Sequence, residues 1–365
     1  MNMKYKLKDI FDLQMGKTPS RNNTEYWNTE EHKWISIADL TKTGKYISET
    51  KECLSNRAID DSGIKVIPAN TVVMSFKLSI GKTAITAEDM YSNEAIMAFH
   101  DKHVVKILPE YIYYMFKYKN WDEGSNKAVM GKTLNKATLS EVEIDICSLE
   151  EQREIVKVLD KMMSVLDGRE TELSLLDDLI KARFVEMFGD ESNPLGWDVV
   201  NVEDVATVQV GVVIKPAQYY TDAANGVRAF RSLNIGSMYI KDNDWVYFSE
   251  EGNSKNAKSI LKENDLIIVR SGAPGTACVV TKEYAGCNAI DIIIAHPDMN
   301  KVNPYYLCAY TNLPHGKRQI DEGTGGAAQQ HFNVGKYNKL QLMLPPIEKQ
   351  DEFVLFMEQV DKSKF

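Results

Sequence analysis

Residues 148–189 read SLEEQREIVKVLDKMMSVLDGRETELSLLDDLIKARFVEMFG, and this stretch decides how the chain is organised. Five large apolar residues recur in it at a strict spacing of seven: Leu159, Leu166, Leu173, Ile180 and Met187. A sustained heptad is typical of a helix that carries a coiled-coil seam. We therefore predict one helix over residues 149–188, with a length of about 60 Å at about 1.5 Å per residue.

Both ends of this helix carry the expected signals. Ser148 and Glu151 fit a capping box, in which the two side chains satisfy free amides of the first turn. Gly189 and Pro194 follow the last heptad position, and a glycine followed by a proline favours a helix stop. Gly168, in the middle, weakens the helix by about 1 kcal/mol relative to alanine.

The segments on either side of the helix repeat one another. The run 67–75 returns as 261–269, an offset of 194, and Glu151-Gln152 returns as Lys349-Gln350, an offset of 198. The order of these echoes is preserved, which indicates a diverged tandem duplication. The predicted divisions are a first domain, a helix, a second domain and the start of a second helix, at residues 1–148, 149–190, 191–346 and 347–365.

Each domain shows short β-branched runs broken by Gly, Asn, Asp and Pro, which is typical of strands and turns. The clearest predicted strands are 72–74, 83–86, 266–269, 278–281 and 292–294. Short helices are predicted at 109–119 and 304–311, each with a proline in its first turn. The sequence thus predicts an α+β chain of two tandem-duplicated strand-rich domains separated by a long coiled-coil helix.

The second helix is shorter than the first in this sequence. It begins after Pro346 and repeats the apolar positions of the first helix before the sequence ends at Phe365. We expect one of three situations: a truncated helix, an exposed seam over Leu173, Ile180 and Met187, or a seam covered by another chain. An exposed end would drive self-association.

Composition excludes several protein classes. The 365 residues are 44% hydrophobic and 26% charged, with no run of about 18 apolar residues that could span a bilayer and no apolar core of a signal peptide. Five widely spaced cysteines indicate a reduced, cytoplasmic protein without a disulfide framework or a zinc site. The net charge of −9 is concentrated in 149–190, so that local basic surfaces remain possible in the two domains.

Motifs for catalysis are weak. Three Gly-Lys-Thr triplets, at residues 16, 81 and 131, lack the second glycine that a phosphate-binding loop needs. His100-Asp101-Lys102-His103 could suggest a metal site, but a surface turn is the better interpretation. Asn303-Pro304-Tyr305 is better interpreted as a helix start than as a methyltransferase signature. We therefore predict no catalytic residues and no metal or cofactor in this chain.

Loops rich in Lys, Arg, Ser, Thr, Asn and Gln occur at matching places in both repeats. In the first repeat the candidates are Lys17, Thr18, Ser20, Arg21, Lys77, Ser79, Lys82, Lys127 and Lys132. In the second they are Arg228, Arg231, Asn234, Arg270, Ser271, Thr276, Gln329, Gln330 and His331. Cationic side chains pair with phosphates, and Arg, Gln and Asn can read base edges. Any one of these residues can be an ordinary solvated side chain, but the recurrence of the sets favours DNA binding.

The chain resembles a known family over essentially its whole length. The matching blocks are Asp9–Arg21, Trp34–Leu40, Met74–Lys82, Ser92–Ala95, Leu149–Gln152, Arg183–Asp190 and Leu344–Gln350. They resemble the specificity subunit of type I restriction-modification enzymes. The order of two recognition domains, each followed by a helix, is more specific than any single block.

The resemblance implies a mechanism without chemistry in this chain. Each target-recognition domain would read one half of a bipartite double-stranded DNA target, and the helices would fix the spacing. Two modification subunits, which bind S-adenosylmethionine and methylate adenine, would dock on this chain. Restriction subunits that use ATP and Mg²⁺ would join them. Half-sites one turn apart are about 34 Å apart, which the long helix can bridge.

Two alternatives stay open at this point. A stand-alone DNA-binding or antirestriction module would show the same repeat without a modification partner, and co-purification separates the two. A coiled-coil scaffold without DNA affinity would fail a salt-dependent DNA-binding assay.

Overall fold

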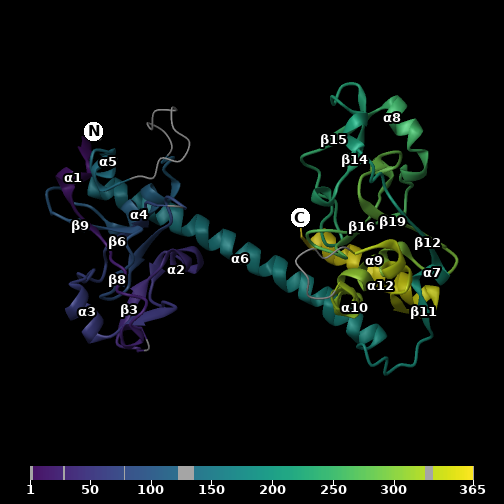
Figure 1. Ribbon diagram of the computed structural model, residues 1–365, viewed down its shortest axis with the longest axis horizontal. Coiled ribbons are helices and arrows are strands. Elements are labelled where there is room, and N and C mark those ends of the chain that lie inside the picture. Colours follow the sequence, from purple (N-terminus) through teal and green to yellow (C-terminus); the bar gives the residue numbers. More distant parts are fainter. Residues whose placement is uncertain (1–2, 28, 78, 122–134, 325–331, 365) are drawn as a thin grey trace. The chain divides into compact units, whose positions relative to one another are not determined.

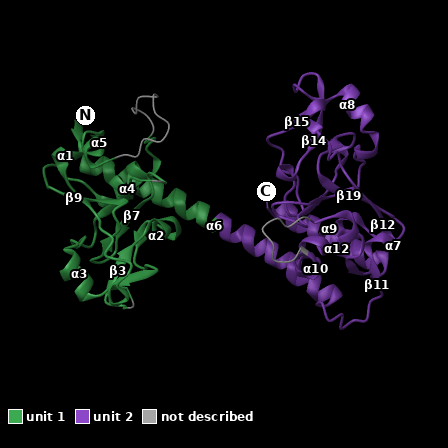
Figure 2. Ribbon diagram, in the orientation of Figure 1, with its two compact units in different colours: residues 1–168 green, residues 169–365 purple. Residues whose placement is uncertain are grey.

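A computed structural model describes residues 3–27, 29–77, 79–121, 135–324 and 332–364. The chain divides into two compact units, residues 1–168 and 169–365 (Figure 2). The division falls at Gly168, within the helix α6 (Leu149–Phe188), so that each unit contains part of this helix. The predicted helix bounds of 149 and 188 are confirmed. Its cap is also confirmed, because Ser148 N donates to Glu151 Oε2 at 3.0 Å and Glu151 N donates to Ser148 Oγ at 3.3 Å.

Unit 1 is built from ten strands and the first part of α6 among its described residues (Figure 1). The strands are β1 (Met3–Lys6), β2 (Phe11–Met15), β3 (His32–Ile35), β4 (Tyr46–Ile47), β5 (Glu52–Leu54), β6 (Val72–Ser75), β7 (Thr83–Thr86), β8 (Tyr91–Ser92), β9 (Ile96–Asp101) and β10 (Glu143–Ile146). The shorter helices are α1 (Leu7–Ile10), η1 (Thr24–Tyr26), α2 (Ile37–Lys42), α3 (Asn56–Ser62), α4 (Pro109–Tyr118) and α5 (Lys136–Ser140). The strands form sheets in the orders β2-β9-β6-β7-β4, β5-β3-β8 and β1-β10.

Unit 2 repeats this plan after α6. Its strands are β11 (Val199–Asn201), β12 (Ala206–Val210), β13 (Tyr220–Thr221), β14 (Gly226–Phe230), β15 (Val246–Ser249), β16 (Leu266–Val269), β17 (Ala277–Val279), β18 (Asn288–Ala289), β19 (Ile292–Pro297) and β20 (Gln341–Met343). Its helices are α7 (Val202–Val205), η2 (Pro216–Tyr219), η3 (Ser232–Asn234), α8 (Glu250–Lys255), η4 (Ala257–Ser259), η5 (Lys282–Tyr284), α9 (Pro304–Asn312), α10 (Pro314–Thr324), α11 (Val334–Asn338) and α12 (Ile347–Ser363). The sheet orders are β12-β19-β16-β17, β13-β15-β14-β18 and β11-β20.

The sheet orders match between the units. β2-β9-β6-β7 in unit 1 corresponds to β12-β19-β16-β17 in unit 2, and the smaller sheet of each unit contains a matching parallel pair, β3 with β8 and β14 with β18. Unit 1 has a further parallel pair, β4 with β7. This shared topology confirms the tandem duplication of an α+β unit. Two predicted strands differ from the structure by more than one residue, since β17 covers 277–279 in place of 278–281 and β19 covers 292–297 in place of 292–294.

The central strands are buried on both faces, because alternate side chains enter different cores. In β6, Val72 and Met74 pack with Ile112 and Phe116 of α4, whereas Val73 packs in the core on the other face. In β16, Leu266 and Ile268 share a core with α9 and the end of α6, whereas Ile267 and Val269 face a separate core. The central strands of the main sheet therefore lie between two cores, and solvent reaches mainly the edge strands, the strand ends and their loops.

The predicted seam is used unevenly by the two units. In unit 1, Leu159 is half-buried against the core, whereas Leu166 is 55% exposed. In unit 2, Leu173 is half-buried, Ile180 is buried and Met187 packs against the core.

Helix α12 covers the end of α6. The two helices run antiparallel, since Arg183 contacts Glu352 at 3.3 Å and Asp177 contacts Lys364 at 2.9 Å. Of the three situations expected for this seam, exposure of Ile180 and Met187 is therefore wrong. The short α12 packs on one face of the C-terminal half of α6, where Ile180 is buried, whereas Leu175, Leu179 and Val185 on other faces of that half stay exposed.

Candidate nucleic-acid interface

Three loops of unit 1 meet at one end of its main sheet. Lys17 N donates to Ser92 O at 2.8 Å, which joins the loop after β2 to the turn before β9. Phe76 N donates to Ala95 O at 3.0 Å, which joins the loop after β6 to the same turn. Residues 16–21, 76–77, 79–82 and 92–95 are thus held together, and we refer to them as the unit 1 loops.

The same framework holds three loops of unit 2. Val212 N donates to Ala289 O at 2.8 Å, as Lys17 N does to Ser92 O in unit 1. The loop after β16 closes in the same way as the loop after β6, with Gly275 N donating to Val269 O at 3.0 Å. Residues 211–216, 270–276 and 289–292 are therefore equivalent to the unit 1 loops, and we call them the unit 2 loops.

A carboxylate lies at the centre of the predicted residues in unit 1. The Thr18 hydroxyl donates to Glu94 Oε2, and this hydrogen bond holds the pKa of Glu94 below its usual value. The cationic side chains of Lys77 and Arg21 lower this pKa further. Three of the predicted DNA-binding residues therefore gather around one exposed carboxylate.

Arg21 also makes its own fixed contacts. Its guanidinium donates to Glu52 through two bonds, one of them 3.0 Å from Nη2 to Oε2. The same group lies 3.8 Å from the ring centroid of Trp27 and 5.0 Å from that of Trp34. Arg21 thus fastens the loop to the smaller sheet while about half of its side chain stays exposed.

The remaining predicted residues of unit 1 lie on the same loops. Lys17 Nζ donates to the carbonyl of Ser62, and Lys82 Nζ donates to Thr41 Oγ1 at 2.6 Å. Ser20 and Ser79 are exposed. Lys127 and Lys132 lie outside the described residues.

In unit 2, Arg270 is the best-fixed candidate. Its Nη1 donates to Asp291 Oδ1, and its Nε donates to Phe332 O at 3.3 Å. Ser271 and Thr276, on the same loop, are half-buried. Gln329, Gln330 and His331 lie outside the described residues.

Arg228 and Arg231 lie on the smaller sheet of unit 2 and its following turn. The Arg228 guanidinium lies 5.5 Å from the ring of Trp245 and 5.7 Å from that of Tyr284, with Asp242 at 3.8 Å. Arg231 Nη2 donates to the carbonyl of Asp244. Both side chains are partly exposed.

Asn234 does not belong to this surface as the structure places it. Its side chain is fully buried, its Oδ1 accepts from Arg231 N at 3.0 Å and its Nδ2 donates to Asn243 O at 2.7 Å. A buried amide that caps a turn has no free edge for a base. We therefore leave Asn234 out of the candidate surface.

Sequence reasoning missed two kinds of residue on these loops. Glu94 and its equivalent Asp291 were not among the candidates, because an acidic side chain does not pair with phosphates, although both repeats carry an acidic residue at this position. Val213 and Ile214, the equivalents of Thr18 and Pro19, are 50% and 78% exposed. The same loop is thus polar in unit 1 and apolar at its tip in unit 2.

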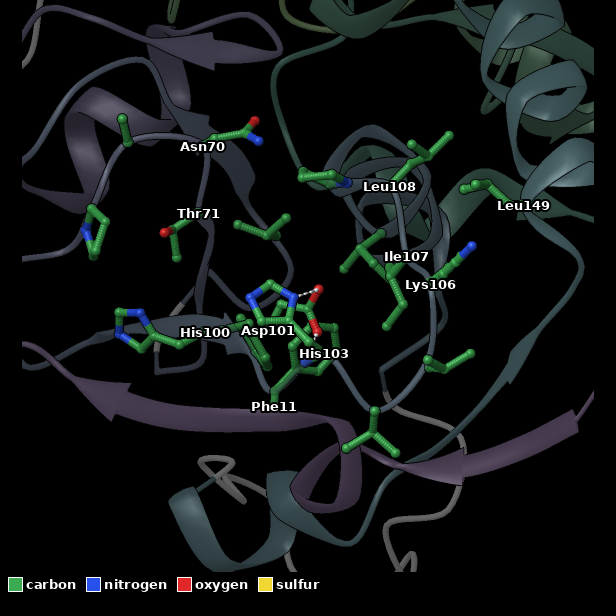
Figure 3. A pocket seen from close by; sticks show the side chains of 18 residues that line it. Phe11, Asn70, Thr71, His100, Asp101, His103, Lys106, Ile107, Leu108 and Leu149 are labelled. Carbon is green, nitrogen blue, oxygen red and sulfur yellow. Dashed lines mark hydrogen bonds and ion pairs between the residues drawn. The ribbon is translucent and has the colours of Figure 1, made fainter.

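A cavity of about 850 Å³ in unit 1 lies at the other end of the sheet (Figure 3). It is lined by Thr71, Phe99 and Leu149 among others, where Val72 pairs with Phe99. The candidate loops leave the sheet beyond the opposite pair, Ser75 with Ile96. The cavity is therefore separate from these loops.

The histidines near this cavity correct one prediction. His100 and Asp101 belong to β9 and not to a surface turn, and His100 Nε2 lies 3.1 Å from Gln14 Oε1. Burial lowers the pKa of His100. His103 follows the strand and pairs with Asp101 at 3.1 Å.

Two searches of the described residues bear on the class of site. No group of three or more His, Cys, Asp or Glu side chains there could hold a metal ion. Within the same residues, no helix combines the length and apolar character needed to cross a membrane.

Comparison with known families decides the identity of these paired units. The model of the type I restriction modification DNA specificity domain matches the chain twice, over residues 2–174 and 194–365. The chain belongs to this family. A specificity subunit recognises DNA and is not an enzyme, so that the predicted lack of catalytic residues agrees with the family.

Named relatives span most of the chain. The type I restriction enzyme MjaIX specificity subunit of Methanocaldococcus jannaschii is 23% identical, over 93% of this chain and 82% of that protein. The EcoprrI specificity subunit of Escherichia coli is 21% identical, over 97% and 86%. Both relatives are named specificity subunits, and both match over the two repeats. The alternative of a stand-alone module is therefore not better supported.

Solved structures share the fold of this specificity subunit. The S subunit of a type I restriction-modification system from M. genitalium aligns with a TM-score of 0.53 at 13% identity, over all of this chain and 90% of the other. A chain from a study of complex assembly and conformational transition of the type I system aligns with a TM-score of 0.56 at 16% identity, over the same shares.

Proposed function

We propose that each unit reads one half of a bipartite double-stranded DNA target through its three loops, while α6 sets the spacing between the half-sites. The recurrence of one loop framework in both units carries this proposal. The loops occupy the same places, but Thr18 and Pro19 in unit 1 are replaced by Val213 and Ile214 in unit 2. Two similar frameworks with different side chains suit an asymmetric target.

The division of labour on these loops follows from charge and shape. Lys17, Lys77 and Lys82 in unit 1 supply cations for phosphates, which position the protein without reading sequence. Val213 and Ile214 in unit 2 offer exposed methyl groups, which can contact the methyl group of thymine. The two half-sites are therefore expected to differ in sequence.

We infer that the modification subunits dock on an exposed apolar stripe of α6 in unit 1. The stripe consists of Ile155, Val158, Met162, Val165 and Leu166, which are 40–63% exposed. These residues recur at spacings of three and four, so they share one face of the helix. A contiguous apolar face on a soluble protein is typical of a protein interface.

The chemistry of the assembled system belongs to these partners. S-adenosylmethionine would bind the modification subunits, and ATP and Mg²⁺ would bind the restriction subunits that join them. The assembly would act on cytoplasmic DNA.

Co-expression of the chain with its modification subunit, followed by mapping of methylated adenines in the host DNA, tests this function. We expect methylation confined to a two-part motif with a fixed gap. A complex that methylates a continuous motif would contradict the assignment of one half-site to each unit. A chain that binds DNA but co-purifies with no modification subunit would support the stand-alone module instead.

A further inference from the structure

A carboxylate occupies the same place in both units. Glu94 lies in the turn between β8 and β9, and Asp291 lies in the turn between β18 and β19. The residue before each donates its amide to the last residue of the neighbouring parallel strand. These bonds join Asn93 N to Ile35 O at 3.1 Å and Ile290 N to Phe230 O at 2.8 Å. Counted from β8 and β18, Glu94 and Asp291 therefore hold the same place in the duplicated fold, although the turn of unit 2 is one residue shorter before β19.

Each carboxylate is fixed by a donor from a neighbouring loop, but the donors differ. Glu94 accepts from the hydroxyl of Thr18, on the loop after β2. Asp291 accepts from Arg270, on the loop after β16. Both repeats carry a carboxylate at this place, but its partner is a hydroxyl in one and a guanidinium in the other. One particular ion pair therefore does not explain why both repeats carry an acidic residue there.

An acidic side chain is costly on a surface that binds phosphates, because like charges repel. Glu94 is exposed, and the Asp291 side chain is 48% exposed, so both can reach a bound duplex. The Thr18 hydrogen bond, with the nearby Lys77 and Arg21, lowers the pKa of Glu94 and keeps it ionised at neutral pH.

An ionised carboxylate only accepts hydrogen bonds. In the major groove the bases that donate are cytosine, through its N4 amino group, and adenine, through its N6 amino group. We propose that Glu94 and Asp291 are specificity-determining residues, each accepting a hydrogen bond from the amino group of a cytosine or adenine in the half-site of its own unit. This assignment rests on the proposed function.

The test uses the full chain with its modification subunit and a randomised duplex library. Wild type is compared with Glu94→Met and Asp291→Leu, which keep the approximate size of each side chain and remove its accepting oxygens, whereas Gln or Asn would keep one. We expect Glu94→Met to reduce discrimination about tenfold at one position of one half-site, because the amino group of the base loses its acceptor. Asp291→Leu should do the same in the other half-site.

Binding to an unrelated duplex separates base reading from other roles. Both variants should bind such a duplex more tightly than wild type, because a negative charge has been removed from the surface. Lys77→Gln is the matched control, and it should weaken binding to all sequences and reduce the salt slope by about 1. Equal thermal melting of the variants shows that the fold is retained.

Two base analogues identify which base each carboxylate contacts. A purine without the 6-amino group replaces adenine, and a pyrimidinone without the 4-amino group replaces cytosine. In each half-site, one of these substitutions should weaken the binding of wild type. The variant at the carboxylate of that unit should bind the substituted and the normal duplex equally well.

The failures of the two proposals differ. If the variants keep the wild-type preference at every position, or lose affinity evenly for all sequences, the assignment of Glu94 and Asp291 is overturned while the two-part reading stands. If wild type selects no two-part sequence, the proposed function fails, and this assignment fails with it.

Discussion

Phe184 shows at the residue scale how the end of α6 becomes part of unit 2. Its ring is fully buried and lies 4.9 Å from that of Phe188, 5.7 Å from Tyr306 and 5.2 Å from Phe353, measured between centroids. One side chain therefore joins α6, α9 and α12. The aromatic pairs add to the free energy gained from apolar burial.

We expect Phe184→Ala to lower the free energy of unfolding of unit 2 by about 3–5 kcal/mol, because it removes a large buried ring and leaves a cavity. Chemical denaturation of the full chain measures this change. Val185→Ala is the control, since Val185 is 45% exposed, and it should change the free energy little. Equal effects of the two variants would contradict the packing described for α6.

Glu141, just before β10, forms ion pairs with two lysines at and after the end of β1. Its carboxylate accepts from Lys6 Nζ at 2.8 Å and also from Lys8 Nζ. These two hydrogen bonds, with that of Lys6 the stronger cause, lower the pKa of Glu141 to about 2. Lys6 ends β1, and Glu141 precedes β10, the partner strand of β1.

The sign of the pH dependence follows from this lowered pKa. A depressed folded-state pKa contributes stability above the ordinary glutamate pKa, and this stability is lost as the pH falls toward 2. We expect Glu141→Gln to flatten the fall in the free energy of unfolding of unit 1 between about pH 5 and pH 2. The effect is small and salt-sensitive because the pair is exposed. Parallel pH profiles for wild type and Glu141→Gln would rule out this contribution.

The loops after β2 and β12 depend, at the element scale, on two equivalent glycines. A Cβ at Gly16 would overlap the carbonyl oxygen of Ser92, and a Cβ at Gly211 would overlap that of Ala289. Backbone atoms cannot yield as a flexible side chain can. Both glycines therefore allow the first loop of each unit to lie against the turn that carries Glu94 or Asp291.

We expect Gly211→Ala to displace the loop 211–216 and to weaken discrimination in the half-site of unit 2, with a loss of stability of about 1–3 kcal/mol from overpacking. Methylation mapping and thermal melting measure the two effects. Gly44→Ala is the control, because nothing lies within 4 Å of its Cβ position. If the variant at 211 keeps the wild-type motif, the loop does not contribute to recognition.

The exposed stripe of α6 matters at the scale of the whole molecule. Ile155, Val158, Met162, Val165 and Leu166 leave an apolar face that the described residues of unit 1 do not cover. We expect the modification subunit to cover it in the complex. In the isolated chain the same face should drive self-association. The sequence analysis expected self-association from another part of the seam, Leu173, Ile180 and Met187.

We expect Met162→Lys to abolish co-purification with the modification subunit and to reduce self-association, because a charge is costly in an apolar interface. Affinity capture and light scattering at high concentration measure these effects. Ser164→Lys adds the same charge on the opposite face of the helix and should leave both unchanged. A monomeric wild type at high concentration would refute the self-association, and a Met162→Lys variant that still captures its partner would refute the docking site.

The sequence by itself determined the helix at 149–188, the duplication and the α+β class, because these depend on local periodicity, capping and repeats. It also placed Thr18, Lys77 and Arg270 on loops at matching places. It could not show that Asn234 faces the interior, or that His100 and Asp101 extend a strand, because burial and strand pairing depend on residues distant in the chain.

Only the tertiary structure decided which part of the seam is covered. Ile180 and Met187 look like Leu166 in the heptad, but α12 and α9 pack on the first two and not on the third. It also brought Glu94 to Thr18, and Asp291 to Arg270, across loops far apart in sequence. Periodicity identifies the apolar face of a helix, whereas the partner of each side chain depends on how the elements fold together.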